Sequence, residues 1–519
     1  MNRNAILETL SKNSTPWDFI IIGGGATGLG TAVDAAARGY KTLLLEQHDF
    51  AKGASSRSTK LIHGGVRYLA QGNIALVLEA LRERGLLMRN APHLVRHQAF
   101  VVPSYDWWEG PFYGIGMKVY DVLAGRLGLA PSRLLSRDET LAQIPTLEPK
   151  GLRGGVIYYD GQFDDARLAV TLAQTVFDLG GSASNYVKVI SLLKANDLVC
   201  GVIAQDMETG ETFELHARVV INATGAYADA IRRLDDSQVD PIIAPSQGVH
   251  LVLDKSFLPG DSAIMVPHTD DGRVLFVVPW HDRAIVGTTD TPINDFSIEP
   301  RALPEEIEFL LNHAGRYLTK DPTASDVKSI FAGIRPLVKA SAKNETAALS
   351  RDHTILISKS GLLTITGGKW TTYRKMAEDT VNQAAILAGL DERPCITPTL
   401  RLHGWRDNVE SEKSFNIYGI DWSAVRQLIN ENPIFAERLH ENLPYTTAEV
   451  IWAIRHEMAC TVEDILSRRT RALLLDAKAS VAIAPKIAAL MASELGHDEH
   501  WQKQQVADYG ELARGYILV

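Results

Sequence analysis

Cysteine is scarce in this chain, and so are basic charge and long apolar runs. Three of the 519 residues are cysteines and none forms a Cys-x-x-Cys pair, which argues for a reducing compartment and against a dithiol redox centre or a zinc knuckle. The 62 acidic residues outnumber the 53 basic ones, so the positive field that non-specific nucleic-acid binding needs is missing. No apolar run approaches the roughly 18 residues of a membrane span, and residues 1–16 are too polar for a signal-peptide core. We therefore expect neither nucleic acid nor a bound metal, and any redox chemistry requires a cofactor.

The remaining composition is that of a folded protein of several domains. Charged residues make up 22% and hydrophobic residues 45% of the chain, close to the averages for globular proteins. At roughly 150 residues per domain, the length indicates about three domains or one large two-domain enzyme. A disordered chain, a small adaptor and a disulfide-stapled scaffold are excluded.

The segment from residue 18 to residue 46 predicts one β-α-β unit. The apolar run of residues 19–22 is typical of a buried parallel strand, and it leads directly into a glycine-rich turn. Small residues at 32–37 predict a helix that ends near residue 39. Residues 42–45 predict the second strand.

Gly23, Gly25 and Gly28 satisfy the G-x-G-x-x-G fingerprint of dinucleotide binding within this unit. They allow a tight turn, close backbone approach to a pyrophosphate, and close packing of the helix on the strand. The helix N-terminus holds the phosphates with unpaired N–H groups and its positive dipole. Glu46, 18 residues past Gly28, can accept hydrogen bonds from a ribose diol.

The β-α-β unit alone does not separate FAD from NAD. A flavin cofactor is longer and needs backbone contact along its whole length, for which residues 55–60 and 367–368 are the candidates. Residues 218–225 and 362–369 each predict a strand that ends in a small-residue turn, and the second opens a helix through residue 387.

The rest of the chain predicts a sheet and a helical region. Strand-like runs at residues 249–253, 274–278 and 284–287 indicate an antiparallel sheet inserted into the nucleotide-binding domain. After about residue 394 the pattern becomes helical, and residues 446–449 fit a capping box.

Five further segments carry a family resemblance. Residues 55–69 read SSRSTKLIHGGVRYL, residues 287–291 GTTDT, residues 333–337 GIRPL and residues 367–375 GGKWTTYRK. Together with residues 455–471 they closely resemble the FAD-dependent, respiratory glycerol-3-phosphate dehydrogenases, and the match runs nearly end to end. One departure is residue 370, a tryptophan where the family often has a smaller aliphatic residue.

The resemblance implies an α/β fold similar to that of glycine oxidase and other amine oxidases. It consists of a discontinuous Rossmann-like FAD-binding domain, an inserted antiparallel-sheet substrate domain and a C-terminal helical domain. The expected boundaries are an N-terminal arm at 1–16, the FAD-binding domain at 17–90, 150–235 and 330–392, the substrate-binding domain at 91–149 and 236–329, and the helical cap domain at 393–519.

The resemblance also implies an activity. The expected enzyme oxidises sn-glycerol 3-phosphate to dihydroxyacetone phosphate, passing a hydride from C2 to FAD and the electrons on to a membrane quinone. Alternatives are a glycerol-3-phosphate oxidase that uses O2 and releases hydrogen peroxide, an FAD amine or amino-acid oxidase, and a flavin-binding regulatory or scaffold protein. The expected location is the cytoplasm, peripherally on the inner face of the cell membrane, with a homodimer as one option.

A doubly anionic phosphomonoester requires cationic donors in its pocket. By resemblance, Arg67, Arg335 and Lys369 face the substrate, joined by Arg351 and by the hydroxyl of Tyr68. Lys369 and the helix that follows it also favour negative charge on a reduced flavin.

The C2 hydroxyl proton requires a base with a pKa near the working pH, which suits histidine. The resemblance places His250 in the active site, and His63 is the second candidate. The expected cofactor-binding residues are Gly23, Gly25, Thr27, Gly28, Glu46, Ser55, Ser56, Ser58, Thr59, Lys60, His63, Gly64, Gly65, Ala223, Thr224, Gly225, Gly367, Gly368, Lys369, Trp370 and Thr371.

Two segments are candidates for membrane contact. An aromatic-rich stretch, with basic residues nearby, has a composition compatible with an interfacial helix or with a domain's own core. The N-terminal arm, with Ile6, Leu7 and Leu10, is the other candidate. The aromatic-rich stretch comprises Trp107, Trp108, Phe112, Tyr113, Ile115, Met117, Val119 and Tyr120, with Lys118 and Arg126 nearby.

Overall fold

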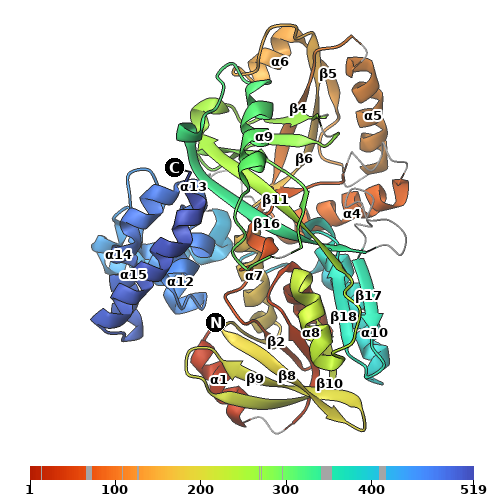
Figure 1. The fold of residues 1–519 in the computed structure, drawn as a ribbon, viewed down its shortest axis with the longest axis vertical. Helices are drawn as coiled ribbons and strands as arrows, with labels where there is room; N and C mark the ends of the chain where they lie inside the picture. Colours follow the sequence, from red (N-terminus) through yellow and green to blue (C-terminus); the bar gives the residue numbers. More distant parts are fainter. Residues whose placement is uncertain are drawn as a thin grey trace.

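Two sheets and a group of helices make up the described part of the chain. The computed structural model describes residues 1–12, 15–65, 73–107, 109–124, 128–267, 269–270, 272–294, 296–339, 353–407 and 416–518. Figure 1 shows one sheet in the lower half of the molecule, the second in the upper half, and the C-terminal helices at the left, beside both.

The first sheet contains the predicted β-α-β unit. Its order is β17-β18-β10-β1-β2-β7, and β1 pairs in parallel with both β2 and β10. The helices α2, α7 and α10 cover it. The strands are β1 (Trp17–Ile22), β2 (Thr42–Leu45), β7 (Ser182–Ser184), β10 (Thr212–Asn222), β17 (His353–Ile357) and β18 (Leu363–Gly367), and the helices are α2 (Ala26–Ala37), α7 (Asp165–Asp178), α8 (Ala228–Asp235) and α10 (Tyr373–Leu387).

Burial explains why β1 is uniformly apolar. Phe19, Ile20 and Ile21 are completely buried, as expected for a parallel strand covered on both faces. Gly30, inside α2, lies directly against Tyr373 of α10, where an added Cβ would be 2.7 Å from the ring. The small residues of α2 therefore let α10, which follows β18, pack close to the nucleotide-binding unit.

The second sheet is mainly antiparallel and runs in the order β15-β11-β14-β13-β12-β4-β6-β3, with β16 paired to β11 and β5 to β6. The helices α4, α5, α6 and α9 accompany it. The bounds are β3 (Leu61–Ile62), β4 (Val95–Ser104), β5 (Arg133–Ser136), β6 (Gly154–Phe163), β11 (Ile243–Asp254), β12 (Ala263–Val266), β13 (Leu275–Trp280), β14 (Arg283–Gly287), β15 (Thr291–Pro292), β16 (Val327–Val338), α4 (Ile74–Asn90), α5 (Glu109–Ala124), α6 (Arg137–Gln143) and α9 (Pro304–Gly315).

The sheet pairings differ from the expected domain boundaries at β6 and β16. Both strands lie in stretches that the sequence assigned to the FAD-binding domain, yet β6 pairs with β4 and β16 pairs with β11 in the second sheet. Hydropathy indicates that a segment forms a strand, but the partner strands of an apolar segment depend on the tertiary fold. The chain therefore crosses between the two sheets at other residues than predicted.

The N-terminal helix α1 (Arg3–Lys12) packs on its own protein. Ile6 and Leu10 are buried in the core of the first sheet, and Arg3 forms a buried ion pair with Asp206 and a second pair with the exposed Glu208. These contacts anchor α1 beside the β8–β9 hairpin (Val187–Ala195 and Leu198–Asp206). The hypothesis that Ile6 and Leu10 contact a membrane is wrong, because both side chains lie inside the fold.

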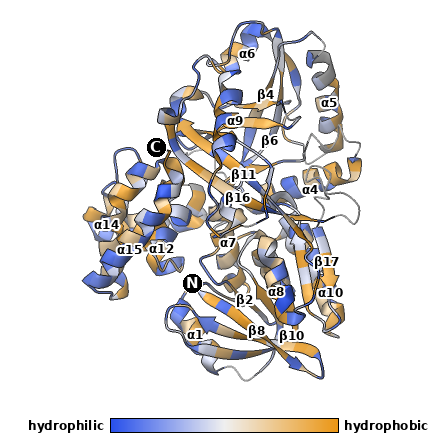
Figure 2. Cartoon of the chain, viewed as in Figure 1, coloured by the Kyte–Doolittle hydropathy of each residue, from blue (hydrophilic) through white to orange (hydrophobic). Residues whose placement is uncertain are grey.

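The C-terminal region is helical, as the sequence predicts. The capping box at α12 is present, with Thr446 and Glu449 in the expected roles. In Figure 2 the strands of both sheets are largely hydrophobic, whereas α14 and α15 alternate along their length. Within the described residues, no helix is both long and apolar enough to cross a membrane. The helices are α11 (Trp422–Glu431), α12 (Thr447–His456), α13 (Ala472–Leu475), α14 (Ala477–Leu495) and α15 (Glu499–Ala513).

Candidate active site

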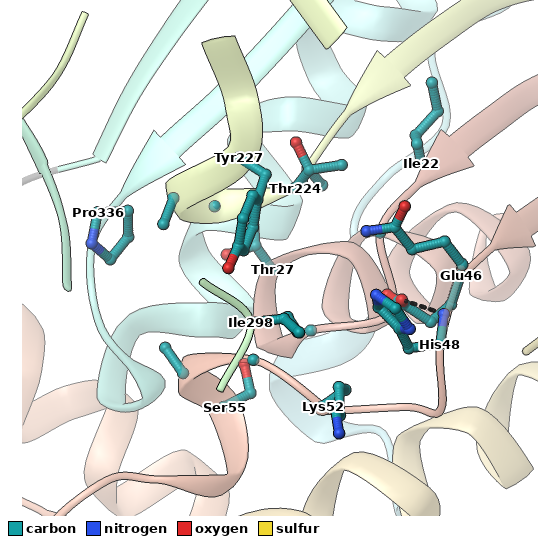
Figure 3. A pocket seen from close by; sticks show the side chains of 18 of the residues that line it. Ile22, Thr27, Glu46, His48, Lys52, Ser55, Thr224, Tyr227, Ile298 and Pro336 are labelled. Atoms are coloured by element: carbon teal, nitrogen blue, oxygen red, sulfur yellow. Dashed lines mark hydrogen bonds between the residues drawn. The ribbon is translucent and has the colours of Figure 1, made fainter. Parts of the chain in front are cut away.

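A cavity of about 630 Å³ lies at the carboxyl ends of β1, β2 and β10. Figure 3 shows Glu46 and His48 on one side of it, Thr224 and Tyr227 on another, and Ser55 and Lys52 below. In an open α/β sheet this edge is where ligands bind. Six parts of the chain contribute lining residues, within the ranges 22–57, 187–190, 223–234, 297–300, 334–336 and 367–370.

The fingerprint glycines stand where a side chain would not fit. A Cβ on Gly28 would lie 1.8 Å from the carbonyl oxygen of Gly23, and Gly23 itself has a φ of +111°. Helix α2 begins directly after Gly25, so its first backbone N–H groups lack intrahelical partners. The Ser55 hydroxyl accepts a hydrogen bond from Ala26 N at 2.9 Å. The turn thus brings bare backbone and a helix N-terminus to the cavity, as pyrophosphate binding requires.

Glu46 lies at the end of β2 and lines the same cavity. Its carboxylate accepts hydrogen bonds from Gly24 N at 2.6 Å and from His48 N at 2.8 Å. Burial raises the pKa of Glu46, although these two N–H groups oppose the shift. The carboxylate is therefore fixed in place beside the glycine turn. Its position along the sequence, 18 residues after Gly28, is the spacing typical of an acid that contacts the ribose.

The last strand of the sheet completes the cavity. Gly367, Gly368, Lys369 and Trp370 follow β18, and the Trp370 indole N–H donates to the carbonyl oxygen of Ser55 at 2.9 Å. This bond joins two segments that are 315 residues apart in sequence. Trp370 thus connects the two segments through this hydrogen bond, and its ring packs edge-on against Phe163.

A second cavity of about 320 Å³ adjoins the first and shares part of its wall, including Arg57, Gly367, Gly368, Lys369 and Trp370. Its other walls come from the second sheet and from the segment after Arg57. Among its lining residues are Ser58, Thr59, His63, Gly65, Asp160, His250, Arg273, Thr288, Asp290, Arg335 and Thr371.

His250 lies in the middle of β11, between two neighbouring strands. Its cross-strand partners are Gly287 on β14 and Phe331 on β16. The imidazole stacks on the Phe331 ring at 4.8 Å, and a Cβ on Gly287 would lie only 2.2 Å from it. Burial, with the charges of Lys60 and Arg335, lowers the pKa of His250 well below 6.5. The ring is therefore clamped and neutral at neutral pH.

Arg335 on β16 faces the second cavity beside β11. Its guanidinium donates to the Thr288 hydroxyl at 3.0 Å and to the Thr289 carbonyl oxygen at 2.9 Å, and it pairs with Asp290 at 3.1 Å. Gly248 makes room for it, because a Cβ there would lie 2.3 Å from the guanidinium. These contacts fix the plane of a group that is still 27% exposed.

The structure brings together most of the predicted site residues. Thr27, Ala223, Thr224 and Gly225 line the first cavity, and Ser58, Thr59, His63, Gly65 and Thr371 line the second. Arg67, Tyr68 and Arg351 lie outside the described residues.

Four predicted cofactor residues are not in the lining of either described cavity: Gly28 in α2, and Ser56, Lys60 and Gly64 in the segment of residues 56–64. Lys60 is completely buried, and its ammonium donates to Asp165 and to the Ser56 carbonyl oxygen. Burial lowers the pKa of Lys60 to about 8, although Asp165 opposes the shift. Gly64 N donates to the Tyr120 hydroxyl, and an added Cβ on Gly64 would strike that hydroxyl. Lys60 and Gly64 therefore hold the loop in place, because each forms a hydrogen bond with a residue of another element, Asp165 in α7 and Tyr120 in α5.

Comparisons with known proteins identify the family. The model of the FAD dependent oxidoreductases matches residues 18–374, and the model of the C-terminal domain of alpha-glycerophosphate oxidase matches residues 361–503. The mitochondrial glycerol-3-phosphate dehydrogenase of Macaca fascicularis is 42% identical, over 97% of this chain and 74% of its own length. The chain belongs to the FAD-dependent glycerol-3-phosphate dehydrogenases.

Solved structures agree with this family. The glycerol-3-phosphate dehydrogenase of Bacillus halodurans, complexed with FAD, superposes with a TM-score of 0.80 at 29% identity, covering 99% of this chain and 98% of that one. Glycine oxidase from Geobacillus kaustophilus shares the fold, with a TM-score of 0.55 at 19% identity, covering 75% and 99%. The predicted fold, cofactor and enzyme class are confirmed: the dehydrogenase is an oxidoreductase that uses FAD.

The residues of this dehydrogenase fit FAD. The glycine turn and the N-terminus of α2 suit a pyrophosphate, and the first cavity extends from Glu46 to Lys369, which gives a long space for the cofactor. Among the described residues, no group of three or more His, Cys, Asp or Glu is placed to hold a metal ion.

Two arginines of the dehydrogenase site were missed by the sequence reasoning. Arg57 lines both cavities and is held by Glu299 and the Ile298 carbonyl oxygen, and Arg273 lines the second cavity. Arg57 stands inside the SSRSTK motif, so its motif context was a usable signal. Arg273 follows a turn before β13 and gave no such signal, because an arginine beside a turn is ordinarily a surface residue.

Proposed function

We propose that the chain oxidises sn-glycerol 3-phosphate at C2, with the substrate in the second cavity. FAD, when bound, supplies the oxidant that accepts the hydride. The observation that carries this proposal is the wall at residues 367–370, which the two cavities share. Beyond it lies the second cavity, which is lined by cationic side chains and by the neutral imidazole of His250.

The cations around the second cavity suit a phosphomonoester. Arg335 presents a guanidinium whose plane is fixed by Thr288 and Thr289, and Arg57, Arg273 and Lys369 line the same space. Planar, charge-assisted donors hold phosphate oxygens in a set geometry, whereas amino acids would need one carboxylate-binding arginine. The cluster therefore favours glycerol 3-phosphate over an amine or amino acid, and a flavin-binding scaffold has no use for it.

His250 has the properties of a proton acceptor. Its lowered pKa keeps the imidazole neutral at physiological pH, so the ring can accept a proton, and a pKa below the working pH makes it a weaker base than the ideal one. His63 lines the same cavity and donates its backbone N–H to the Thr371 hydroxyl at 3.3 Å. Its neighbours on a short strand and a glycine pair favour a structural role in the loop, so His250 is the preferred base.

Anaerobic flavin reduction tests the proposal. The protein reconstituted with FAD should lose its flavin absorbance when sn-glycerol 3-phosphate is added, and keep it when glycerol or an amino acid is added. Retention of the absorbance with glycerol 3-phosphate would contradict the proposal.

Lys369→Ala tests the placement of the substrate phosphate. It should raise KM and lower kcat, reducing kcat/KM roughly 10- to 100-fold, because a hydrogen bond to a charged group contributes about 1.5–3 kcal/mol. Lys375→Ala is the matched control, since Lys375 lies on α10 and pairs with Asp379 at 2.6 Å. An unchanged kcat/KM in Lys369→Ala removes that residue from the site.

The proposed second acceptor is a membrane quinone, which requires contact with a bilayer. The aromatic-rich stretch contains α5, and Tyr113, Met117 and Tyr120 face the core. Ile115 and Val122 are 69% and 79% exposed, and Leu134 of the neighbouring β5 is 60% exposed. They line an apolar hollow of about 540 Å³, flanked by Lys118 and Arg133. Apolar side chains rimmed by cations suit the interface of an anionic bilayer.

Helix α5 explains why the composition of this stretch was compatible both with a membrane interface and with a domain core. One face of the helix packs in the core, and the other face is exposed. Trp107 is 77% exposed, whereas Trp108, the Phe112 side chain and Arg126 lie outside the described residues.

Binding to anionic vesicles should fall in an Ile115→Ser, Val122→Ser double variant, and undiminished binding would exclude the α5 face. Quinone-analogue reduction measured against peroxide yield separates the dehydrogenase from an oxidase.

The homodimer stays a prediction, and sedimentation velocity of the purified protein measures its oligomeric state.

A further inference from the structure

The hydroxyl of Thr59 lies between the second cavity and the imidazole of His250. Thr59 Oγ1 and His250 Nε2 are 2.9 Å apart, within hydrogen-bond distance, and both residues line the cavity. Thr59 belongs to the loop between the dinucleotide unit and β3, whereas His250 is in the centre of β11. Two sequence-distant elements thus meet at one hydrogen bond beside the substrate space.

The other ring nitrogen of His250 is not available to a substrate. Nδ1 is buried, and among the described residues it has no hydrogen-bond partner. The ring cannot turn to present Nδ1, because Phe331 stacks on it and the backbone of Gly287 lies against its Cδ2 edge. A proton that leaves the substrate must therefore reach the imidazole at Nε2, the nitrogen that Thr59 already contacts.

We propose that Thr59 relays the substrate proton to His250, an inference that rests on the proposed function. The C2 hydroxyl gives its proton to Thr59 Oγ1 as the Thr59 proton passes to His250 Nε2, and the C2–H bond breaks with its electron pair leaving as hydride for FAD. One C=O bond forms, the threonine hydroxyl is regenerated, and His250 holds the proton. FAD is the oxidant and the alcohol is the reductant.

The hydrogen bonds of the loop hold Thr59 in place for this transfer. Ser58, next to Thr59, is tied to Asp165 through both its N–H and its hydroxyl, which fixes the loop against α7. In the described residues the Thr59 hydroxyl has one hydrogen-bond partner, Nε2. When Nδ1 carries the ring proton, the Thr59 hydroxyl donates to Nε2 and leaves its lone pairs for a hydroxyl in the cavity.

Two substitutions at position 59 test the relay in the FAD-loaded enzyme. Thr59→Val keeps the shape and removes the hydroxyl, so the rate of flavin reduction at saturating glycerol 3-phosphate should fall roughly 100-fold or more, with half-saturation little changed. Thr59→Ser restores a hydroxyl and should stay within about 5-fold of the original rate. Thr380→Val, which removes a buried hydroxyl bonded to the Met376 carbonyl oxygen in α10, is the matched control.

Combining Thr59→Val with His250→Gln gives a second criterion. Two members of one relay act as a unit, so the double variant should be no slower than the slower single variant. A Thr59→Val rate near the original, or losses that multiply in the double variant, overturns the relay.

A measurement without substrate covers the case in which Thr59→Val fails to fold. Nitrogen NMR of the histidine-labelled protein, with His250 assigned by its own substitution, reports which ring nitrogen carries the proton. The relay requires a proton on Nδ1 and none on Nε2 in the resting protein. A proton on Nε2 overturns it. Because this readout needs no turnover, it distinguishes failure of the relay from failure of the proposed substrate.

Discussion

A buried carboxylate joins the cofactor-binding loop to the C-terminal helical region. Asp49, three residues after Glu46, accepts hydrogen bonds from Arg468 Nε at 2.5 Å and from the two terminal nitrogens of Arg469 at 2.7 and 2.9 Å. Burial alone would raise the pKa of Asp49, but the charges of Arg469 and Arg468 hold it well below 3.8. Asp49→Asn keeps the shape of this contact and removes its charge.

The expected loss follows from what the two guanidiniums retain. Breaking a buried ion pair by removing one partner costs about 3–5 kcal/mol, because the remaining charge stays buried. Arg468 keeps two other carboxylate partners, and Arg469 keeps the Glu457 carbonyl oxygen at 2.8 Å and the Glu457 carboxylate at 3.7 Å. We therefore expect the lower end of the range, about 3 kcal/mol.

Thermal unfolding with and without FAD measures this loss. At roughly 2–4 °C per kcal/mol for a large domain, Tm should fall by about 6–12 °C in Asp49→Asn, and FAD should dissociate more readily. Asp270→Asn is the control: the Asp270–Arg316 pair is also bidentate but exposed, so its loss should lower Tm much less. Equal Tm shifts in the two variants would refute the claim that burial makes the Asp49 contact strong.

Two further predictions concern the active-site histidine and the pH dependence of stability. Gly287→Ala places a methyl group 2.2 Å from the imidazole, so flavin reduction by glycerol 3-phosphate should slow at least 10-fold, whereas Gly510→Ala meets no atom within 4 Å and should leave the rate unchanged. Burial disfavours a charge on His403, but hydrogen bonds to Asp178 and Asp421 outweigh it and raise its pKa to about 9. Its contribution, roughly 1–2 kcal/mol after solvent screening, is complete below pH 6.5 and is lost as pH rises through 9. Equal alkaline destabilisation of His403→Gln and the unaltered protein, measured by urea unfolding, would contradict this.

Local chemistry explains what the sequence predicted well. The glycine turn at residues 23–28 and the acid at Glu46 depend on neighbours a few residues away, and the structure places them as the pattern indicates. The capping box at Thr446 is equally local. The strand containing His250 was also predicted, because the residues on both sides of the histidine, 249 and 251–253, are apolar.

Contacts between distant segments explain what the sequence did not predict. Lys60 lies in a motif that resembles a cofactor loop, but its ion-pair partner Asp165 is 105 residues further along the sequence. No sequence pattern near Lys60 predicts that pair. The link between Thr59 and His250 spans 191 residues. Most of β6 and β16 was expected in the FAD-binding domain for the same reason, although both strands pair in the second sheet.

The order of the strands in the first sheet has a consequence for synthesis of the protein. Leu363 of β18 pairs beside Ile221 of β10, so at 5–20 residues per second the ribosome needs about 7–28 s to supply the missing strand. Until then one edge of β10 is open, and the wall at residues 367–370 that the two cavities share is absent. During this interval FAD cannot stabilise the nascent chain, because its binding cavity is incomplete. The open apolar edge can pair with a wrong strand or bind a chaperone.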